Sequence, residues 1–195
     1  MKKLLPALIC SLSLTACVPA AFVAGAAATG TVVTDGRDMQ TQFEDKTMAH
    51  RVRRALHLNK HIEEGTHISV NTFNHVVLLT GRSQDEELKE KAGSIAQSVS
   101  KVRRVHNELV IADKSTFHEA ATDTWLTTKI KSSLLAERGL KSAQIKVVTD
   151  HHTAYLLGLV TRDQADLATN VTRHVPGVVK VVKLFEYTTE HKPLL

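Results

Sequence analysis

The chain of 195 residues contains 11 histidines, a side chain that often binds metal ions. His57 and His61 stand four positions apart, which puts two side chains on one face of a helix. They straddle the expected end of that helix, however, and no third ligand follows at a fixed spacing. His151 and His152 fall in an expected turn, so we predict surface histidines and no metal site.

Groups arranged for catalysis are missing from the sequence as well. It has no nucleophile elbow, no phosphate-binding glycine loop, no cysteine pair and no paired catalytic carboxylates. We therefore expect no enzyme activity and no cofactor.

Cys17 is a thiol suited to acylation. The chain opens with Met1-Lys2-Lys3, continues through an apolar run and reaches the cysteine through Leu14-Thr15-Ala16. A basic start, an apolar stretch too short to span a bilayer and small residues before a cysteine resemble a bacterial lipobox. The resemblance implies cleavage after residue 16, diacylglycerol on Cys17 and a further acyl chain, such as palmitate, on the new N-terminus. The alternative is an ordinary secretory signal with an incidental cysteine.

The segment after Cys17 predicts a flexible tether over residues 17–44, since residues 18–34 are mostly Ala, Gly, Val and Thr. A second membrane span is the alternative, but the run is interrupted by Pro19, Gly25 and Gly30. Several acyl chains anchor a protein stably. By analogy with lipoprotein sorting, Val18 favours the outer membrane, with the protein on its periplasmic face.

Trp125, the only tryptophan, stands in the first turn of a predicted helix whose buried stripe is Leu126, Ile130 and Leu134. The face around the tryptophan continues through Thr128, Lys129 and Ser132. A tryptophan on a polar, basic face suits a membrane interface, where the ring lies at headgroup level and lysine meets phosphate. The alternative is a tryptophan folded back against the other half of the chain. Further candidate headgroup contacts are Lys131, Arg138 and Lys141.

The elements around Trp125 occur twice. A helix, two strands, a helix and a strand are expected in residues 123–188, and residues 45–112 repeat that order with an offset of 78 to 76 residues. The sequence predicts two tandem domains in these ranges. The remaining segments are a leader (1–16), the tether, a linker (113–122) and a tail (189–195).

Apolar periodicity assigns an α+β fold to each repeat, a small αββαβ domain with a three-stranded sheet packed on two helices. Capping boxes at Ser83–Glu86 and Thr161–Gln164 predict where the second helices begin. Three glycines, at recurring strand positions and before the last strand, are expected to have structural roles. They are Gly81, Gly158 and Gly177.

The pattern Val77-x-Leu79-x-Gly81 and the pair Gly177-Val178 resemble the BON domain. With the lipobox and tether, the two copies are similar to dual-BON outer-membrane lipoproteins. The resemblance implies binding of anionic phospholipid (phosphatidylglycerol, cardiolipin) by the first helix of the second domain, a role in envelope integrity and a place at the division site. The chain departs from the family pattern in lacking glycine at Val99–Val102 and in both hairpin turns.

The outer face of the second predicted sheet is apolar, because it carries Tyr155, Leu157, Leu159, Val182 and Leu184. The solvated face of an antiparallel sheet is normally polar. We therefore expect this face to be covered by the first repeat, by the linker or by a partner protein.

Net charge is +5 and falls to +3 without the leader, and the basic residues form no long run. This excludes a dedicated nucleic-acid binder and permits attraction to an anionic membrane. The sequence thus predicts a non-enzymatic, lipid-anchored protein that binds anionic phospholipid through its second domain. The alternative is an interaction module whose apolar face engages an outer-membrane assembly or cell-wall component.

Overall fold

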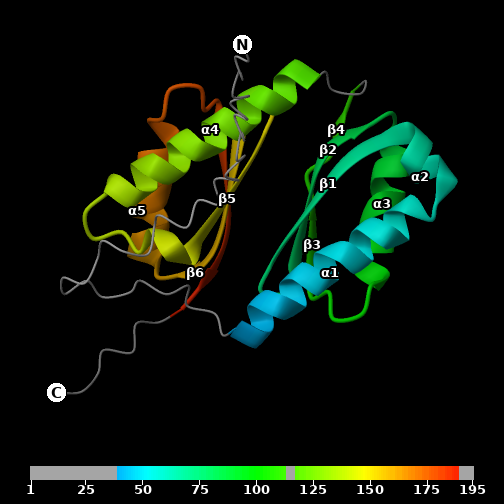
Figure 1. The fold of residues 1–195 in the computed structure, drawn as a ribbon, viewed down its shortest axis with the longest axis horizontal. Coiled ribbons are helices and arrows are strands. Elements are labelled where there is room, and N and C mark those ends of the chain that lie inside the picture. The colour runs from blue at the N-terminus through cyan, green and yellow to red at the C-terminus, as the bar shows by residue number, and fades with distance from the viewer. Residues whose placement is uncertain (1–38, 113–116, 189–195) are drawn as a thin grey trace, which may run out of the picture. The chain divides into compact units, whose positions relative to one another are not determined.

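The computed structural model describes residues 39–112 and 117–188, and both repeats belong to one compact unit. The first repeat contains α1 (Met39–His57), α2 (Lys60–Gly65), β1 (Thr66–Phe73), β2 (Val76–Ser83), α3 (Glu86–Ser98), β3 (Arg104–Asn107) and β4 (Val110–Ile111) (Figure 1). The second contains α4 (Phe117–Ala136), η1 (Ser142–Gln144), β5 (Ile145–Asp150), β6 (Thr153–Val160), α5 (Arg162–Arg173) and β7 (Lys180–Tyr187). The expected α+β class is confirmed, and both repeats contain the expected elements in the expected order. The first repeat also has a short helix that was not expected, because α2 lies between the first helix and the first strand.

Both sheets are mixed rather than antiparallel. Strands β1 and β2 pair antiparallel, as do β5 and β6, whereas the last strand of each repeat runs parallel to the central one. The parallel pairing arises because α3 and α5 are crossover helices that return the chain to the same end of the sheet. In the first repeat the last strand is interrupted at Glu108 and Leu109, so this sheet has four strands instead of the expected three.

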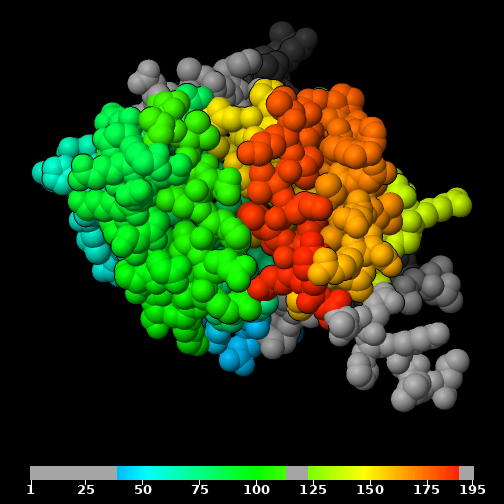
Figure 2. All heavy atoms as spheres, turned by 180° about the vertical axis from the view of Figure 1, so that it is seen from behind, coloured from blue at the N-terminus to red at the C-terminus, as the bar shows by residue number. Residues whose placement is uncertain are grey.

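The helices of each repeat lie on one face of its own sheet (Figure 1). In the first repeat α1 buries Val52 and Leu56 against β1 and β2, and in the second α4 buries Leu126, Ile130 and Leu134. These are the apolar stripes that the helical periodicity predicts. Strand β7 forms the edge of the second sheet and reaches the surface beside α5 (Figure 2).

The first helix of each repeat begins earlier than expected. Helix α1 starts at Met39, within the range assigned to the tether, and α4 starts at Phe117, within the range assigned to the linker. Neither extension contains glycine or proline, so nothing in the local sequence stops the helix before the apolar stripe begins.

The start of α3 also differs. Ser83 ends β2, so the capping box expected there is wrong, and the cap is Asp85, whose carboxylate accepts the amide hydrogen of Leu88 at 2.7 Å. At α5 the expected cap is present, because Thr161 Oγ1 accepts from the amide of Gln164 at 3.3 Å. The Gln164 side chain bonds the loop after α4 instead of closing the box.

Both hairpin turns, Asn74–His75 and His151–His152, hold non-glycine residues at φ between 46° and 62°. A helix carboxylate stabilises each turn. The oxygens of Asp45 accept the amide hydrogens of Asn74 and His75 at 2.7 and 2.8 Å. Asp123 does the same in the second turn at 2.9 and 3.2 Å. This aspartate clamp explains how the turns form without glycine.

Two of the glycines expected to be structural lie where backbones approach closely. A Cβ on Gly81, which has φ of +116°, would lie 2.0 Å from the carbonyl oxygen of His67. A Cβ on Gly158 would lie 2.7 Å from the carbonyl oxygen of Gln144. Gly177 has φ of +104° and faces Leu126. These positions require glycine for backbone packing.

We expect Asp45→Ala to lower the free energy of unfolding by about 3 kcal/mol, because it leaves two turn amides without their charged acceptor. Asp45 is only 3% exposed, so water replaces the carboxylate poorly. Urea unfolding measures the change. Glu90→Ala, at an exposed site of α3, is the control and should stay within about 0.5 kcal/mol. A loss at Asp45 below about 1 kcal/mol would contradict the clamp.

Gly81→Ala and Gly139→Ala separate backbone crowding from backbone conformation. Both glycines have positive φ, but a Cβ on Gly139 would meet nothing within 4 Å. We expect Gly139→Ala to cost about 1 kcal/mol in unfolding free energy, and Gly81→Ala at least about 3 kcal/mol. Equal costs in chemical denaturation would show that crowding at Gly81 is unimportant.

Candidate functional site

The outer face of α4 presents an aromatic ring and a cation together. Trp125 is 58% exposed, and the Lys129 ammonium lies 4.6 Å from the ring centroid. This distance is in the range of a cation–π contact. Lys129 Nζ also lies 3.4 Å from the carbonyl oxygen of Pro176, which brings the loop before β7 next to the pair. Trp125 is therefore not folded back against the first repeat.

The other predicted headgroup contacts are spread along α4 and beyond its end. Thr128 and Ser132 are exposed on the side of Trp125, with the Thr128 hydroxyl donating to the Thr124 carbonyl at 3.1 Å. Lys131 is exposed on the flank of this face, as its spacing from Trp125 requires. Arg138 and Lys141 are exposed in the loop that follows the helix.

One apolar residue on this surface escaped the sequence analysis. Leu135 is 77% exposed, although it follows directly after the buried Leu134. Consecutive helical positions differ by about 100°, so a leucine next to the buried stripe points away from the core. That spacing was the available signal. The outer face of α4 thus offers two large apolar side chains with lysines between them.

The apolar face of the second sheet is occupied. Tyr155 and Leu157 are buried in a cluster with Phe73 and Leu78 from the first repeat. Leu159, Val182 and Leu184 pack against the same cluster. Burial, followed by the charges of Glu108 and Asp150, raises the pKa of Tyr155 to about 12. The sequence left open whether the first repeat, the linker or a partner protein covers this face, and in the structure the first repeat covers it.

Polar contacts between the repeats accompany this cluster. Glu186 accepts from the Asn74 side-chain amide at 2.6 Å and forms an ion pair with Arg103. Lys146 Nζ donates to the Thr72 carbonyl at 3.0 Å. These bonds fix the register in which the two apolar faces meet.

Three ligand-type side chains converge near the second turn. Atoms of Asp123, Asp150 and His151 lie within 4.8 Å of one another. Each has a structural bond: Asp123 holds the turn amides, Asp150 accepts from the amide of Gly81 at 3.1 Å, and His151 Nε2 accepts from Arg82 Nε at 2.8 Å. The trio links the turn to the first repeat, and sequence spacing gave no sign of that link.

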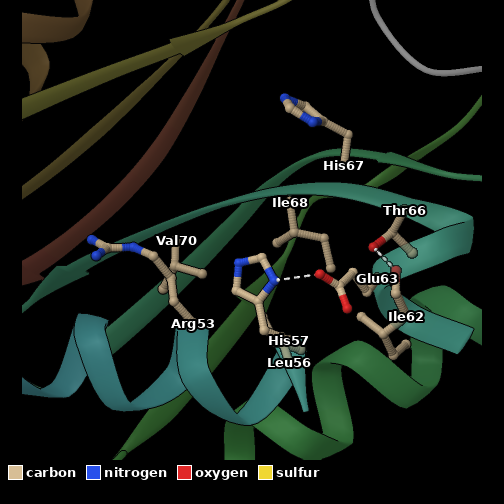
Figure 3. A pocket seen from close by; sticks show the side chains of 9 residues that line it. All are labelled: Arg53, Leu56, His57, Ile62, Glu63, Thr66, His67, Ile68 and Val70. Atoms are coloured by element: carbon tan, nitrogen blue, oxygen red, sulfur yellow. Dashed lines mark hydrogen bonds and ion pairs between the residues drawn. The ribbon is translucent and has the colours of Figure 1, made fainter. Parts of the chain in front are cut away.

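His57 and His61 are not brought together as a ligand pair, because one ends α1 and the other lies in α2. His57 instead pairs with Glu63 at 3.4 Å, at the mouth of a cavity of about 330 Å³ (Figure 3). The cavity has an apolar floor formed by Leu56, Ile62, Ile68 and Val70. This is the lower end of the size range of ligand pockets.

Cys17, the leader and the tail lie outside the described residues. In the part of the chain that is described, no helix is long and apolar enough to cross a bilayer.

The model of the BON domain matches residues 44–113 and 122–189, which together make up most of the chain. The chain belongs to the BON-domain family. The two repeats are therefore BON domains, α1 being the first helix of BON domain 1 and α4 that of BON domain 2.

Three known proteins, each covered by this chain over two-thirds or more of its own length, are also similar in sequence. The outer membrane lipoprotein DolP of Haemophilus influenzae is 34% identical over 96% of both chains. A 21 kDa hemolysin of Actinobacillus pleuropneumoniae is 34% identical over 78% of this chain and 79% of its own length. The osmotically-inducible protein Y of Escherichia coli is 32% identical over 71% and 70%. The similarity to the first of these spans both BON domains and the N-terminal segment.

A buried Leu157 predicts slow thiol labelling. In a chain that begins at residue 17 and carries Cys17→Ser, we expect Leu157→Cys to react with a maleimide at least about 100-fold more slowly than Leu135→Cys, because a buried thiol must wait for local opening. Leu184→Cys, at a half-buried position, should fall between them. Circular dichroism verifies the fold. Equal rates at all three positions would mean that the apolar face is open to solvent.

Proposed function

We propose that this protein is a non-enzymatic, lipid-anchored binding module that contacts anionic phospholipid through α4 of BON domain 2. The observation that carries the proposal is the pairing of the exposed Trp125 with the half-buried Lys129, with 4.6 Å between ring centroid and ammonium. An indole ring settles at the level of lipid headgroups, and a lysine beside it is at the depth of the phosphates.

The rest of the outer face suits the same ligand. Leu135 adds a second exposed apolar side chain, and Lys131 a second cation. Thr128 and Ser132 provide hydroxyls that can donate to phosphate oxygens. The helix itself is held by Leu126, Ile130 and Leu134 in the core, so this face is presented without loss of packing.

The anchor in this proposal is Cys17, acylated after removal of residues 1–16. The protein would then be anchored to the outer membrane, as the name of the Haemophilus influenzae relative supports. We place it on the periplasmic face of that membrane as part of the same proposal. A headgroup contact on a tethered domain acts at high effective concentration, so a weak interaction is enough to hold the domain on the membrane. Envelope integrity and a division-site location are the cellular roles that the family resemblance favours.

The second candidate function, binding of an envelope protein through the apolar face of BON domain 2, is less well supported. Phe73 and Leu78 already pack on Tyr155 and Leu157. A partner on this face would have to displace BON domain 1.

The test uses the mature chain with Cys17→Ser, which retains both cores because they lie C-terminal to residue 39. We expect Trp125→Glu to reduce binding to vesicles of phosphatidylglycerol or cardiolipin at least about tenfold. The substitution removes the ring and gives the protein a negative charge, which the anionic headgroups repel. Within BON domain 2, amide shifts on titration should be confined to residues 123–135.

The matched control is Tyr187→Glu. Tyr187 is 47% exposed and has its own cation partner, since Arg162 lies 4.7 Å from the ring centroid, but it stands on β7. It should bind vesicles as the parent does. Unchanged binding by Trp125→Glu with a native circular dichroism spectrum would reject the site.

A further inference from the structure

Helix α1 of BON domain 1 carries a straight stripe of exposed side chains along its full length. Its members follow one another at intervals of three or four residues, so they share one face of the helix. We call this set the α1 stripe: Met39, Phe43, Lys46, His50, Arg54 and His57, all exposed. The opposite side of the helix is buried through Met48, Val52 and Leu56.

The α1 stripe lies on a basic segment and itself carries two cations, Lys46 and Arg54. Residues 46–60 contain five Lys and Arg residues and no acidic residue. The two acidic residues just before this segment are bonded to other parts of the protein. Glu44 contacts His75 and Lys101, and Asp45 accepts the amide hydrogens of the hairpin turn. Among the described residues, no carboxylate forms an ion pair with Lys46 or Arg54. Within residues 39–112 and 117–188, the stripe meets an acid at its last member alone, where His57 lies 3.4 Å from Glu63.

The N-terminal end of the stripe is apolar. Met39 is 88% exposed and Phe43 71% exposed. Large side chains at this exposure have no cover from the described parts of the protein. Their neighbours on the stripe are cations, which is the composition of a helix that lies in a membrane interface.

The stripe is not a copy of the site on α4. By the repeat offset of 78 residues, Thr47 stands where Trp125 stands, and Arg51 where Lys129 stands. The exposed aromatic of α1 comes one helical turn earlier than that of α4. The two helices have the same place in the fold and have acquired exposed apolar and basic residues at different positions.

The chain also brings this end of α1 close to the predicted anchor. Residues 18–38 separate Cys17 from Met39. If these residues form the tether that the sequence predicts, a linker of that length has a typical end-to-end distance of about 25 Å. Met39 and Phe43 are the first described residues to follow it.

We propose that the α1 stripe is a second contact for an anionic lipid surface, with Met39 and Phe43 entering the interface and Lys46 and Arg54 facing phosphates. This rests on the proposed function in taking anionic lipid as the ligand and Cys17 as the anchor. A soluble polyanion would use the cations alone and would leave the two apolar side chains in water.

The test measures co-flotation of mature Cys17→Ser chain with vesicles containing phosphatidylglycerol. A basic residue near an anionic membrane contributes about five-fold in affinity, so Lys46→Ala with Arg54→Ala should lose about 25-fold. The matched control, Arg104→Ala with Lys183→Ala, removes the same charge from exposed positions on strands β3 and β7 and should lose less than about three-fold. Equal losses in the two pairs would overturn the proposal, since net charge alone would explain them.

A second variant tests the apolar end. Phe43→Ser should weaken binding to the anionic vesicles and leave binding to heparin, a soluble polyanion, unchanged. Vesicle binding that Phe43→Ser does not alter would overturn the assignment to lipid. All the substituted side chains are exposed, so thermal unfolding should match that of the parent chain.

Combination with Trp125→Glu separates this inference from the proposed function. If α1 is a contact in its own right, Lys46→Ala with Arg54→Ala lowers vesicle binding whatever the effect of Trp125→Glu. If Trp125→Glu has no effect while the α1 pair lowers binding, the α4 site is rejected and the α1 stripe stands. If Trp125→Glu abolishes binding and the α1 pair binds like the parent, the α1 stripe is rejected and the α4 site stands.

Discussion

The central strands β2 and β6 are buried on both faces, and each repeat therefore needs two covers for its sheet. Residues 76–81 and 154–158 contain no exposed position. The helices supply one cover in each repeat. The other cover is the opposite repeat, through Phe73 and Leu78 on one side and Tyr155 and Leu157 on the other. A domain of this size buries only about 60% of its unfolded surface, so the shared cluster is a substantial part of its stability.

This packing leaves the outer faces of the helices as the surfaces open to a ligand. Both α1 and α4 have their buried stripes against a sheet and large apolar side chains on the opposite side. Because the inner and outer faces of a helix are independent, duplication could keep Val52 and Ile130 in the core while the outer positions diverged. Weak lipid contacts on such faces become effective when a tether holds the domain near the membrane.

The aspartate clamps link the helices to the hairpins on which the repeats meet. Asp45 and Asp123 stand at the same position of the repeat and hold turns that are far away in sequence. The turn of the second repeat then contacts BON domain 1 through Asp150 and His151. The position of α4 is thus tied to the interface between the repeats, although Trp125 and Lys129 on its outer face take no part in that interface.

The sequence by itself determined the duplication, the α+β class, the order of elements and the stripes that α1 and α4 bury, because these depend on local periodicity and spacing. It also put Trp125 and Lys129 on one helix face. Only the tertiary structure decided the parallel last strands, the early helix starts, the caps of the hairpins and which of three covers lies on Tyr155 and Leu157. The physical reason is that periodicity shows which side of an element is apolar, whereas the partner that buries it is chosen by contacts between residues far apart in the chain.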